Sequence, residues 1–220
     1  MGKYILGCLG LLIVGIIILA IIVGANWAGS YNALVKQSQA VDSTWAEVQN
    51  QYQRRAQLIP NLVATVSGAA NFEKSTLIAV TDARASVGQV KIDPSHAPDN
   101  QAELDKYKAA QDSLTSAVSR LLVVSENYPN LRSDQNFVDL QAQLEGTENR
   151  IAVARNYFNQ AVQTYNSTVL SFPTNIVAGF SHFQTKPYFQ ANAGAENAPQ
   201  VNFNFNSNAP ATTNAAPANP

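Results

Sequence analysis

The chain has 220 residues, of which 46% are hydrophobic and only 13% are charged, with a formal net charge of -1 at pH 7. This balance provides no basic surface for nucleic acid, and the single cysteine, Cys8, excludes a disulfide framework. The length suits one domain of ordinary size with a separate apolar segment.

The first predicted element is a membrane-spanning helix over residues 4–25, which contain no charged side chain. At about 1.5 Å per residue it would extend roughly 33 Å, enough to cross a hydrocarbon core of about 30 Å. A secretory signal has a shorter apolar core, of roughly 7–15 residues. Trp27 and Tyr31 follow at the depth of the headgroup layer, where amphipathic rings prefer to lie. These features favour a retained single-pass anchor in a lipid bilayer.

Two further features of this segment concern its topology and association. Lys3 precedes the segment and the next basic residue is Lys36, so the positive-inside rule favours an inside N-terminus and an outside domain. Ala20, Gly24 and Ala28 recur every fourth residue and would line one helix face, where a second backbone could approach closely. Small residues are also common in membrane helices in general. A homo-oligomer is therefore one of two interpretations of this face.

The rest of the chain shows a long helical repeat. Apolar residues recur at steps of three and four over residues 27–69, 104–128 and 137–172. Residues 91–100, with two prolines, and residues 127–136 are predicted loops. The pattern predicts an all-α fold in which long helices pack against one another.

A third break is predicted at residues 67–71. Gly68 would stop one helix and Asn71 would cap the next, and Ser133 or Asp134 would cap the last helix. Without that break, one helix would run through residues 30–88, roughly 87 Å, about twice the length of the next helix. We therefore predict an antiparallel up-and-down bundle of four helices, with a three-helix body as the alternative. The four predicted helices span residues 30–67, 71–88, 101–128 and 134–171.

An arginine and a proline interrupt the first helix of this body. Pro60 removes a backbone donor and crowds the carbonyl of Ala56, at about 3 kcal/mol, so a kink is expected. Arg55 falls on the apolar stripe, where an unpaired guanidinium would be very costly. We expect Arg55 to pair with Glu126 or Glu148, or to extend its charged end to water at the edge of the groove.

The same residues carry a family resemblance. Residues 31–84 contain, in order, a YN-x-L-V opening, a tryptophan, the block Q-x-Q-R-R-x-x-L-I-P-N-L-V, and later F-E-K and A-R elements. With "RNYFNQAVQTYN" and "FPTNIVAGFSHFQTKPYFQ" farther on, the chain resembles the LemA family of bacterial envelope proteins over about residues 26–203. Many members carry an acylated cysteine just before the YN element. Gly29 and Ser30 stand there in this chain, which excludes lipidation at that site and favours the transmembrane anchor.

The resemblance implies an antiparallel bundle of long helices attached to the bacterial inner membrane, with the bundle on the periplasmic or extracellular side. It leaves the molecular function open, although some relatives are connected with envelope stress or with shaping intracellular membranes. The expected organisation is an anchor at residues 4–25, a helical bundle at residues 30–186, and a largely disordered, low-complexity tail at residues 187–220. Within that tail, "VNFNFN" alternates like a strand and could add to the sheet edge of a partner.

No catalytic site, cofactor or metal is expected. His96 and His182 are too few and too scattered for an obvious metal site or triad, and no P-loop or dinucleotide fingerprint appears. Glu145 and Glu148 share a helix face but are expected to be solvated surface.

Other polar residues are expected to be structural or to mediate interactions. Arg150 and Arg155 flank the stripe and could pair with Glu126 or Asp112 across the bundle. The amphipathic segment 174–183 is expected to cover the open end of the bundle, with the membrane surface as the alternative. The residues assigned to such roles are Arg55, Pro60, Asn61, Arg84, Arg150, Arg155 and Asn166.

Two function classes fit the sequence. The first is a membrane-tethered scaffold or interaction module whose bundle associates with itself or with an envelope protein. The second is an accessory factor in envelope stress or in membrane protein quality control, beside a protease or chaperone. Both have the lipid bilayer as a partner, and neither involves nucleic acid.

Overall fold

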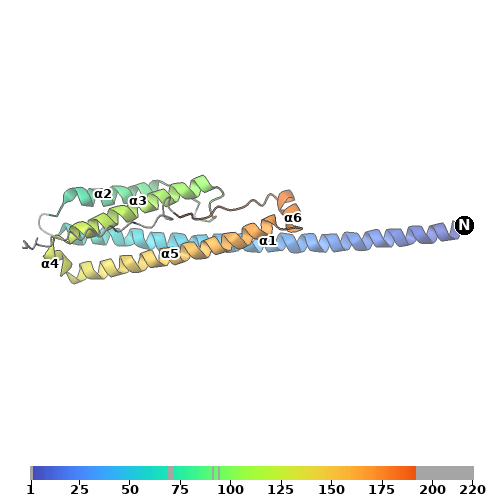
Figure 1. Cartoon of the computed structure of the whole chain (residues 1–220), viewed down its shortest axis with the longest axis horizontal. Coiled ribbons are helices and arrows are strands. Elements are labelled where there is room, and N and C mark those ends of the chain that lie inside the picture. The colour runs from blue at the N-terminus through green and yellow to red at the C-terminus, as the bar shows by residue number, and fades with distance from the viewer. Residues whose placement is uncertain (1, 69–71, 91, 94, 192–220) are drawn as a thin grey trace, which may run out of the picture. The chain divides into compact units, whose positions relative to one another are not determined.

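A computed structural model describes residues 2–68, 72–90, 92–93 and 95–191, with side chains from Leu12 onward within these ranges. Every regular element in the described ranges is a helix, which confirms the predicted all-α fold (Figure 1). The helices are α1 (Gly2–Ser67), α2 (Lys74–Gln89), α3 (Gln101–Ser125), α4 (Pro129–Arg132), α5 (Gln135–Leu170) and α6 (Thr174–Phe180).

The apolar N-terminal segment and the first helix of the body form one continuous helix, α1, of 66 residues. Its large apolar side chains between Leu12 and Val23 are 52% to 65% exposed. Among the described residues, α1 is the one helix that is long and apolar enough to cross a membrane. The body of the molecule therefore begins on the same rod as the candidate span, with no loop between them.

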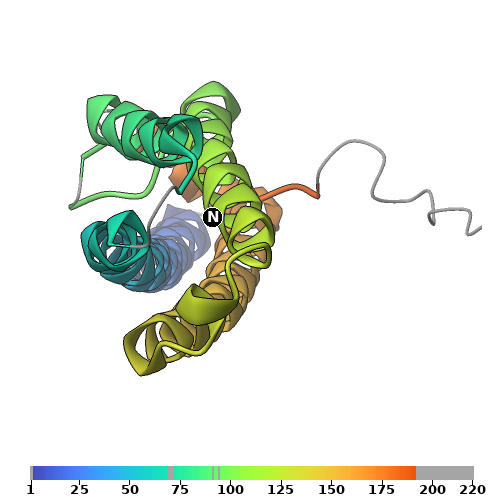
Figure 2. The ribbon, with the colours of Figure 1, turned by 90° about the vertical axis from the view of Figure 1, so that its left-hand side faces the viewer.

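The remaining helices pack along the second part of α1. Figure 2, viewed along the helices, shows α1 and α5 on one side and α2 and α3 on the other. α5 runs antiparallel to α1, because Tyr52 meets Arg155 while Arg55, one turn later, meets Glu148. α2 packs on α3, and the aromatic contact between Phe72 and Tyr128 closes that end of the pair.

Two hydrophobic clusters fill the space between the helices. The Trp45 cluster lies nearer the candidate span and includes Leu34, Trp45, Tyr107, Phe158 and Phe189. The Ile59 cluster lies farther along α1 and includes Ile59, Leu62, Val80, Leu121 and Leu144. Arg55 lies between the two clusters on α1, so polar side chains divide the apolar stripe at this point. We call Arg55 and the polar side chains around it the polar level.

The helix ends agree with the sequence in part. The helix breaks after Ser67 as predicted, and the side chain of Asp134 accepts a hydrogen bond from the backbone N–H of Phe137 at 3.1 Å, which makes it the cap of α5. Asn71 lies outside the described residues, and Glu73 precedes α2 without a capping side-chain bond. The region 127–136 is not only a loop, because the four-residue helix α4 begins there at Pro129.

Candidate functional site

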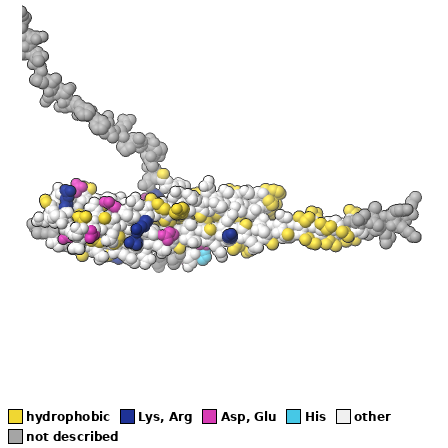
Figure 3. Space-filling view, turned by 90° about the horizontal axis from the view of Figure 1, so that it is seen from below, with side chains coloured by type: hydrophobic (Ala, Val, Ile, Leu, Met, Phe, Trp, Pro, Cys, Tyr) yellow, Lys and Arg dark blue, Asp and Glu magenta, His cyan; other side chains and the backbone are white. Residues whose placement is uncertain are grey.

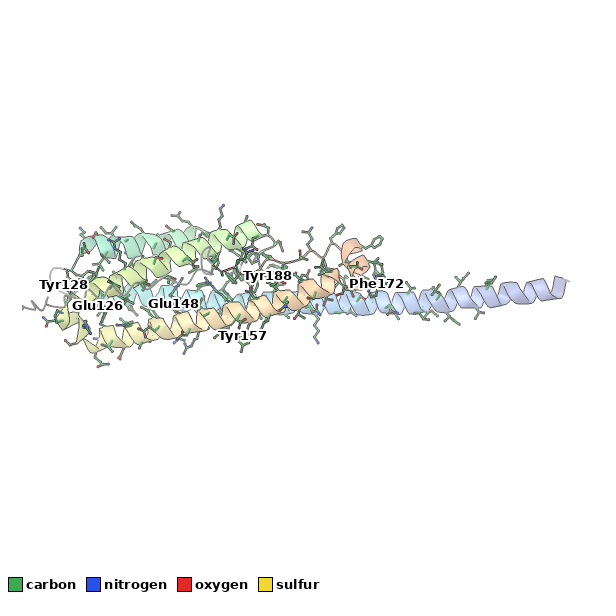
Figure 4. The ribbon with its side chains drawn as sticks, in the orientation of Figure 1. Glu126, Tyr128, Glu148, Tyr157, Phe172 and Tyr188 are labelled. Carbon is green, nitrogen blue, oxygen red and sulfur yellow. The ribbon has the colours of Figure 1, made fainter. Side chains whose placement is uncertain are left out.

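A buried arginine forms the polar level between the two clusters. Arg55 is only 1% exposed. Its Nη1 donates to Glu148 Oε1 at 2.8 Å and to Thr115 Oγ1 at 2.6 Å, and its Nη2 donates to both the backbone and side-chain oxygens of Gln111. Of the two predicted carboxylates, Glu148 is thus the partner, whereas Glu126 lies at the far end of the body (Figure 4).

The position of Arg55 follows from helix geometry. Residues 52, 55 and 59 of α1 lie on one face, so a charged side chain at 55 must point between α3 and α5. Gln111 and Thr115 are one turn apart on α3 and form one wall of its site. The Glu148 side chain is 41% exposed while that of Arg55 is 2% exposed, so the carboxylate keeps contact with water. The ion pair therefore neutralises the buried charge without burying a second one completely.

A second arginine extends the polar level toward the Trp45 cluster. Arg155 Nε donates to the Tyr52 hydroxyl at 2.6 Å, and its Nη2 lies 3.6 Å from Asp112 Oδ1. This bears out the expected pairing of Arg155 with Asp112. The Arg155 guanidinium also lies over the ring of Phe189, 4.9 Å from its centroid.

The tyrosines of this level stay protonated at neutral pH. Burial raises the pKa of Tyr107 to about 12, against a partial lowering by a hydrogen bond with Gln111 and the nearby Arg55 and Arg155. Burial also raises the pKa of Tyr52, although its bond with Arg155 opposes the shift. The polar level can therefore fix the positions of α1, α3 and α5 through neutral tyrosine hydroxyls and charged arginines.

A second polar contact on α1 involves the backbone carbonyl that Pro60 leaves without its helical donor. The helix continues through Pro60, whose nitrogen cannot donate to the carbonyl of Ala56. Arg84 of α2 donates its Nε to that carbonyl at 3.3 Å. The acceptor that the proline leaves unpaired is thus satisfied from another helix. Asn61 is exposed, and its carbonyl accepts from Thr65 Oγ1 at 2.9 Å.

Asn166 binds the backbone of an extended segment, residues 183–189, which we call the strap. Its Nδ2 donates to the carbonyl of Lys186 at 2.9 Å, and its Oδ1 accepts from the N–H of Lys186 at 2.8 Å. Asn159 makes the same pair of bonds with Phe189, at 3.0 and 2.9 Å. The two asparagines are two helical turns apart on α5, so they hold the strap as a neighbouring strand would. The sequence analysis missed Asn159, although its seven-residue spacing from Asn166 was a signal.

The strap also joins the loop before α3. Lys186 Nζ lies 2.8 Å from Asp99 Oδ1 and 3.4 Å from the carbonyl of Ala97. The N–H of Ala97 donates to Asp42 of α1 at 2.9 Å. Phe189 stacks on Trp45 at 6.1 Å between ring centroids. The strap therefore covers the Trp45 cluster with extended chain instead of a helix (Figures 1 and 2).

The segment after α5 lies next to the end of the candidate span. Val177 and Ala178 of α6 are buried in the Trp45 cluster, which bears out the expectation that this segment covers the bundle. The opposite face remains exposed, with Phe172 at the α5–α6 junction (Figure 4). The ring of Phe180 contacts that of Trp27, with 5.6 Å between their centroids. The ring of Phe183 contacts that of Tyr31, with 5.8 Å between their centroids.

The other residues singled out from the sequence lie apart from these contacts. Arg150 is exposed and lines a groove between α1 and α5 with Glu47 and Tyr157, and its expected pairing with Glu126 or Asp112 stays a prediction. His96 lies 3.5 Å from Asp93 on the surface. Within the described ranges, no three His, Cys, Asp or Glu side chains are grouped closely enough to hold a metal ion.

The small-residue face of the span is exposed in the part of the chain that the structure describes. Ala20, Gly24 and Ala28 are exposed, and nothing described lies within 4 Å of a Cβ built on Gly24. Its association with another helix stays a prediction.

Comparison with known proteins connects this geometry with one family. The model of the LemA family matches residues 44–203. Protein LemA of Metamycoplasma hominis is 24% identical over 166 residues, which cover 75% of this chain and 71% of that protein. Magnetosome protein MamQ 2 of Paramagnetospirillum magneticum is 28% identical over 175 residues, 73% of this chain and 64% of the relative. MamQ of Magnetospirillum gryphiswaldense is 27% identical over 174 residues, with 72% and 64% covered.

The family match contains most of the described body. It begins one residue before Trp45 and includes Arg55, Pro60, Asn159 and Asn166. Because the matched range covers well over half of the sequence, it confirms the resemblance found in the sequence motifs. The chain belongs to the LemA family.

Proposed function

We propose that this protein is a single-pass, membrane-anchored scaffold or interaction module of the bacterial cell envelope, without catalytic activity. The observation that carries the proposal is the continuity of α1, which joins the candidate span to the packed body without a hinge loop. A body held in this way is positioned relative to the bilayer, as a scaffold requires. Relatives named as magnetosome proteins are consistent with a role at a membrane.

The charged groups of the interior are used to hold the helices together. Arg55 binds side chains of α3 and α5, and Arg155 binds side chains of α1 and α3. The exposed groove between α1 and α5 offers instead a surface for a partner. Val153 and Tyr157 line it, at 52% and 59% exposure, and Tyr157 points away from the body (Figure 4).

Affinity purification of the full chain in mild detergent tests the proposal. Recovery of further copies or of a stable envelope partner, lost on Tyr157→Ala and retained on the control Tyr188→Ala, would support the interaction module. Recovery of a membrane protease or chaperone would favour the second function, an accessory factor in envelope stress or quality control. A hydrolytic activity lost on Glu145→Gln would contradict the absence of catalysis.

Self-association through the span is a separate part of the proposal. Ala20, Gly24 and Ala28 would let two copies of α1 pack closely, because no long side chain separates the backbones on that face. Gly24→Leu should lower the fraction of cross-linked dimer, while Gly15→Leu, elsewhere in the exposed apolar part of α1, serves as the control. Equal cross-linking of both variants would remove this face from the proposal.

We also propose that the N-terminus lies inside and the body lies on the periplasmic or extracellular side of the inner membrane. Lys3 before the span and the absence of basic residues up to Lys36 support this orientation. In a Cys8→Ser background, Ser95→Cys places a single thiol in the exposed loop before α3. An impermeant maleimide should label it in cells whose outer barrier is opened. Protection until the inner membrane is lysed would reverse the orientation.

A further inference from the structure

The surface around the turn between α5 and α6 carries large apolar side chains. Phe172 is 80% exposed, Phe180 is 73% exposed, Leu170 is 69% exposed and Ile176 is 48% exposed. We call these four residues the turn patch. Figure 3 shows hydrophobic side chains gathered where the body meets the projecting part of α1, with most charged side chains farther along the body. A grouped apolar surface of this kind marks a place of contact with another molecule or with lipid.

The continuous helix α1 fixes the level of the turn patch relative to the candidate span. At about 1.5 Å per residue, Trp27 lies about 3 Å beyond Ala25, the last residue of the apolar run. Phe180 lies at the level of Trp27, because their ring centroids are 5.6 Å apart. Thr174, the first residue of α6, lines a pocket with Ala25 and Gly29. α6 therefore lies beside the first turns of α1 that follow the span.

The charges at this end of the molecule fit that level. The sequence contains no Asp, Glu, Lys or Arg between Lys3 and Lys36, and none between Arg155 and Lys186. These two uncharged stretches are neighbours, since α6 and the end of α5 pack on α1. An interfacial position for the turn patch would thus desolvate no ionised side chain.

We propose that the turn patch inserts into the headgroup and acyl boundary of the bilayer that α1 crosses, and so gives the body a second membrane contact. The inference rests on the membrane anchor of the proposed function. Interfacial helices bury an apolar face about 5–10 Å into this boundary. Phe180 lies beside Trp27, about 3 Å beyond the end of the apolar run, so side chains of the turn patch can reach the boundary from the headgroup side. Val177 and Ala178 on the other face of α6 are buried in the body, so α6 connects the bilayer surface to the Trp45 cluster.

The contact is apolar in character. Its four residues carry no charge, and α6 contains no lysine or arginine that would select anionic lipid. The contact should therefore form on phosphatidylcholine alone. This separates it from a basic amphipathic helix, whose binding depends on anionic headgroups.

Depth-dependent fluorescence quenching tests the inference on the full chain. In a Cys8→Ser background, single cysteines at Leu170→Cys, Ile16→Cys and Val123→Cys carry an environment-sensitive dye in phosphatidylcholine vesicles. Ile16 represents the span, and Val123, 63% exposed on α3, is the matched control away from the patch. Lipids with a nitroxide at a shallow or a deep position act as quenchers. We expect deep quenching at residue 16, shallow quenching at residue 170 that is at least about threefold stronger than at residue 123, and little at residue 123.

The outcomes separate the inference from the proposed anchor. Deep quenching at residue 16 with none at residue 170 would overturn the second contact and leave the anchor in place. No quenching at residue 16 would overturn the anchor and this inference together. A dye at residue 170 that is shielded from water but not quenched by lipid would show that protein covers the patch, which also overturns the inference.

A variant of the patch itself provides the second test. Phe172→Glu combined with Ile176→Glu should lower the quenching at residue 170 at least about threefold, because two carboxylates would have to leave water. Both side chains are exposed, so helicity and thermal unfolding should be unchanged. Val138→Glu, 44% exposed near the start of α5, is the control and should leave the quenching unchanged. Persistent quenching in the double variant would overturn the proposal.

Discussion

The Trp45 cluster and the Ile59 cluster are built on the same pair of helices but are completed differently. Around Ile59, the helix α2 supplies Val80 and Ala83 as a further apolar wall. Around Trp45, the strap and the loop before α3 take that place. A helix satisfies its own backbone, whereas an extended segment needs external partners for every buried N–H and C=O. This difference explains why Asn159 and Asn166 face the strap and have no counterpart toward α2.

The largest expected effect comes from removing the polar level between the clusters. Arg55→Ala should lower the free energy of unfolding by about 3–5 kcal/mol, because the truncation leaves a cavity at a fully buried site and removes the buried donor of Gln111. Urea unfolding of the full chain in detergent, followed by circular dichroism, measures the change. Arg54→Ala alters the exposed neighbour and should have an effect within about 0.5 kcal/mol. Similar losses in both variants would show that the buried level does not hold the clusters together.

Detaching the strap should destabilise the Trp45 cluster more than the Ile59 cluster. Asn159→Ala removes both bonds to Phe189 and should cost about 1–3 kcal/mol. Amide hydrogen exchange should rise at Phe189 and Lys186 while α2 stays protected. Asn156→Ala, on an exposed face of the same helix, is the control. Equal acceleration in α2 and in the strap would mean that the two clusters open as one unit.

High pH should weaken the level next to the Trp45 cluster. Burial raises the pKa of Tyr107 from 10.0 in the unfolded chain to about 12 in the folded protein. The contribution of Tyr107 to the free energy of unfolding is therefore fully present below pH 10 and is lost as the pH rises toward 12. Tyr107→Phe should be more resistant to unfolding across this window by an amount on the order of 2 kcal/mol. The measurement is the pH midpoint of the loss of helicity. Tyr157→Phe, at an exposed position, should leave that midpoint unchanged.

The smallest effect concerns the Ile59 cluster, where Arg84 reaches the Ala56 carbonyl. Arg84→Ala should cost about 0.5–1 kcal/mol, because the bond is solvent-exposed. In a Pro60→Ala background the restored backbone donor should remove most of that cost, and Pro60→Ala should itself raise local stability unless a kink is needed for packing. A double-mutant cycle measures the coupling. Additive effects would exclude compensation between Arg84 and Pro60.

The helical periodicity of this structure could be predicted from the sequence. Steps of three and four predicted the long helices, and the place of Arg55 on the apolar stripe predicted either a carboxylate partner or a charged end that reaches water, of which the structure shows the first. The contacts of Arg84 and Asn159 could not be predicted in the same way. Their acceptors and donors are backbone groups, which carry no residue identity, and the strap has no repeat that would indicate its neighbour.

The shortest element was beyond a periodic argument. α4 has four residues, too few turns for a helical repeat to be distinguished from chance, whereas α6 lies within the amphipathic segment 174–183 that the sequence predicted. The choice of Glu148 over Glu126 likewise required the relative position of α3 and α5. That position depends on how side chains interdigitate rather than on the spacing along one helix.

Because α1 is unbroken, any tilt of its apolar N-terminal part in a bilayer would move the whole body. Residues 27–67 extend roughly 60 Å beyond the apolar run, so a change of about 10° in helix tilt would displace the tip of the body by about 10 Å. Thinner bilayers tilt a helix that is too long for them. Local membrane thickness would thereby be converted into the reach of the end that carries α4.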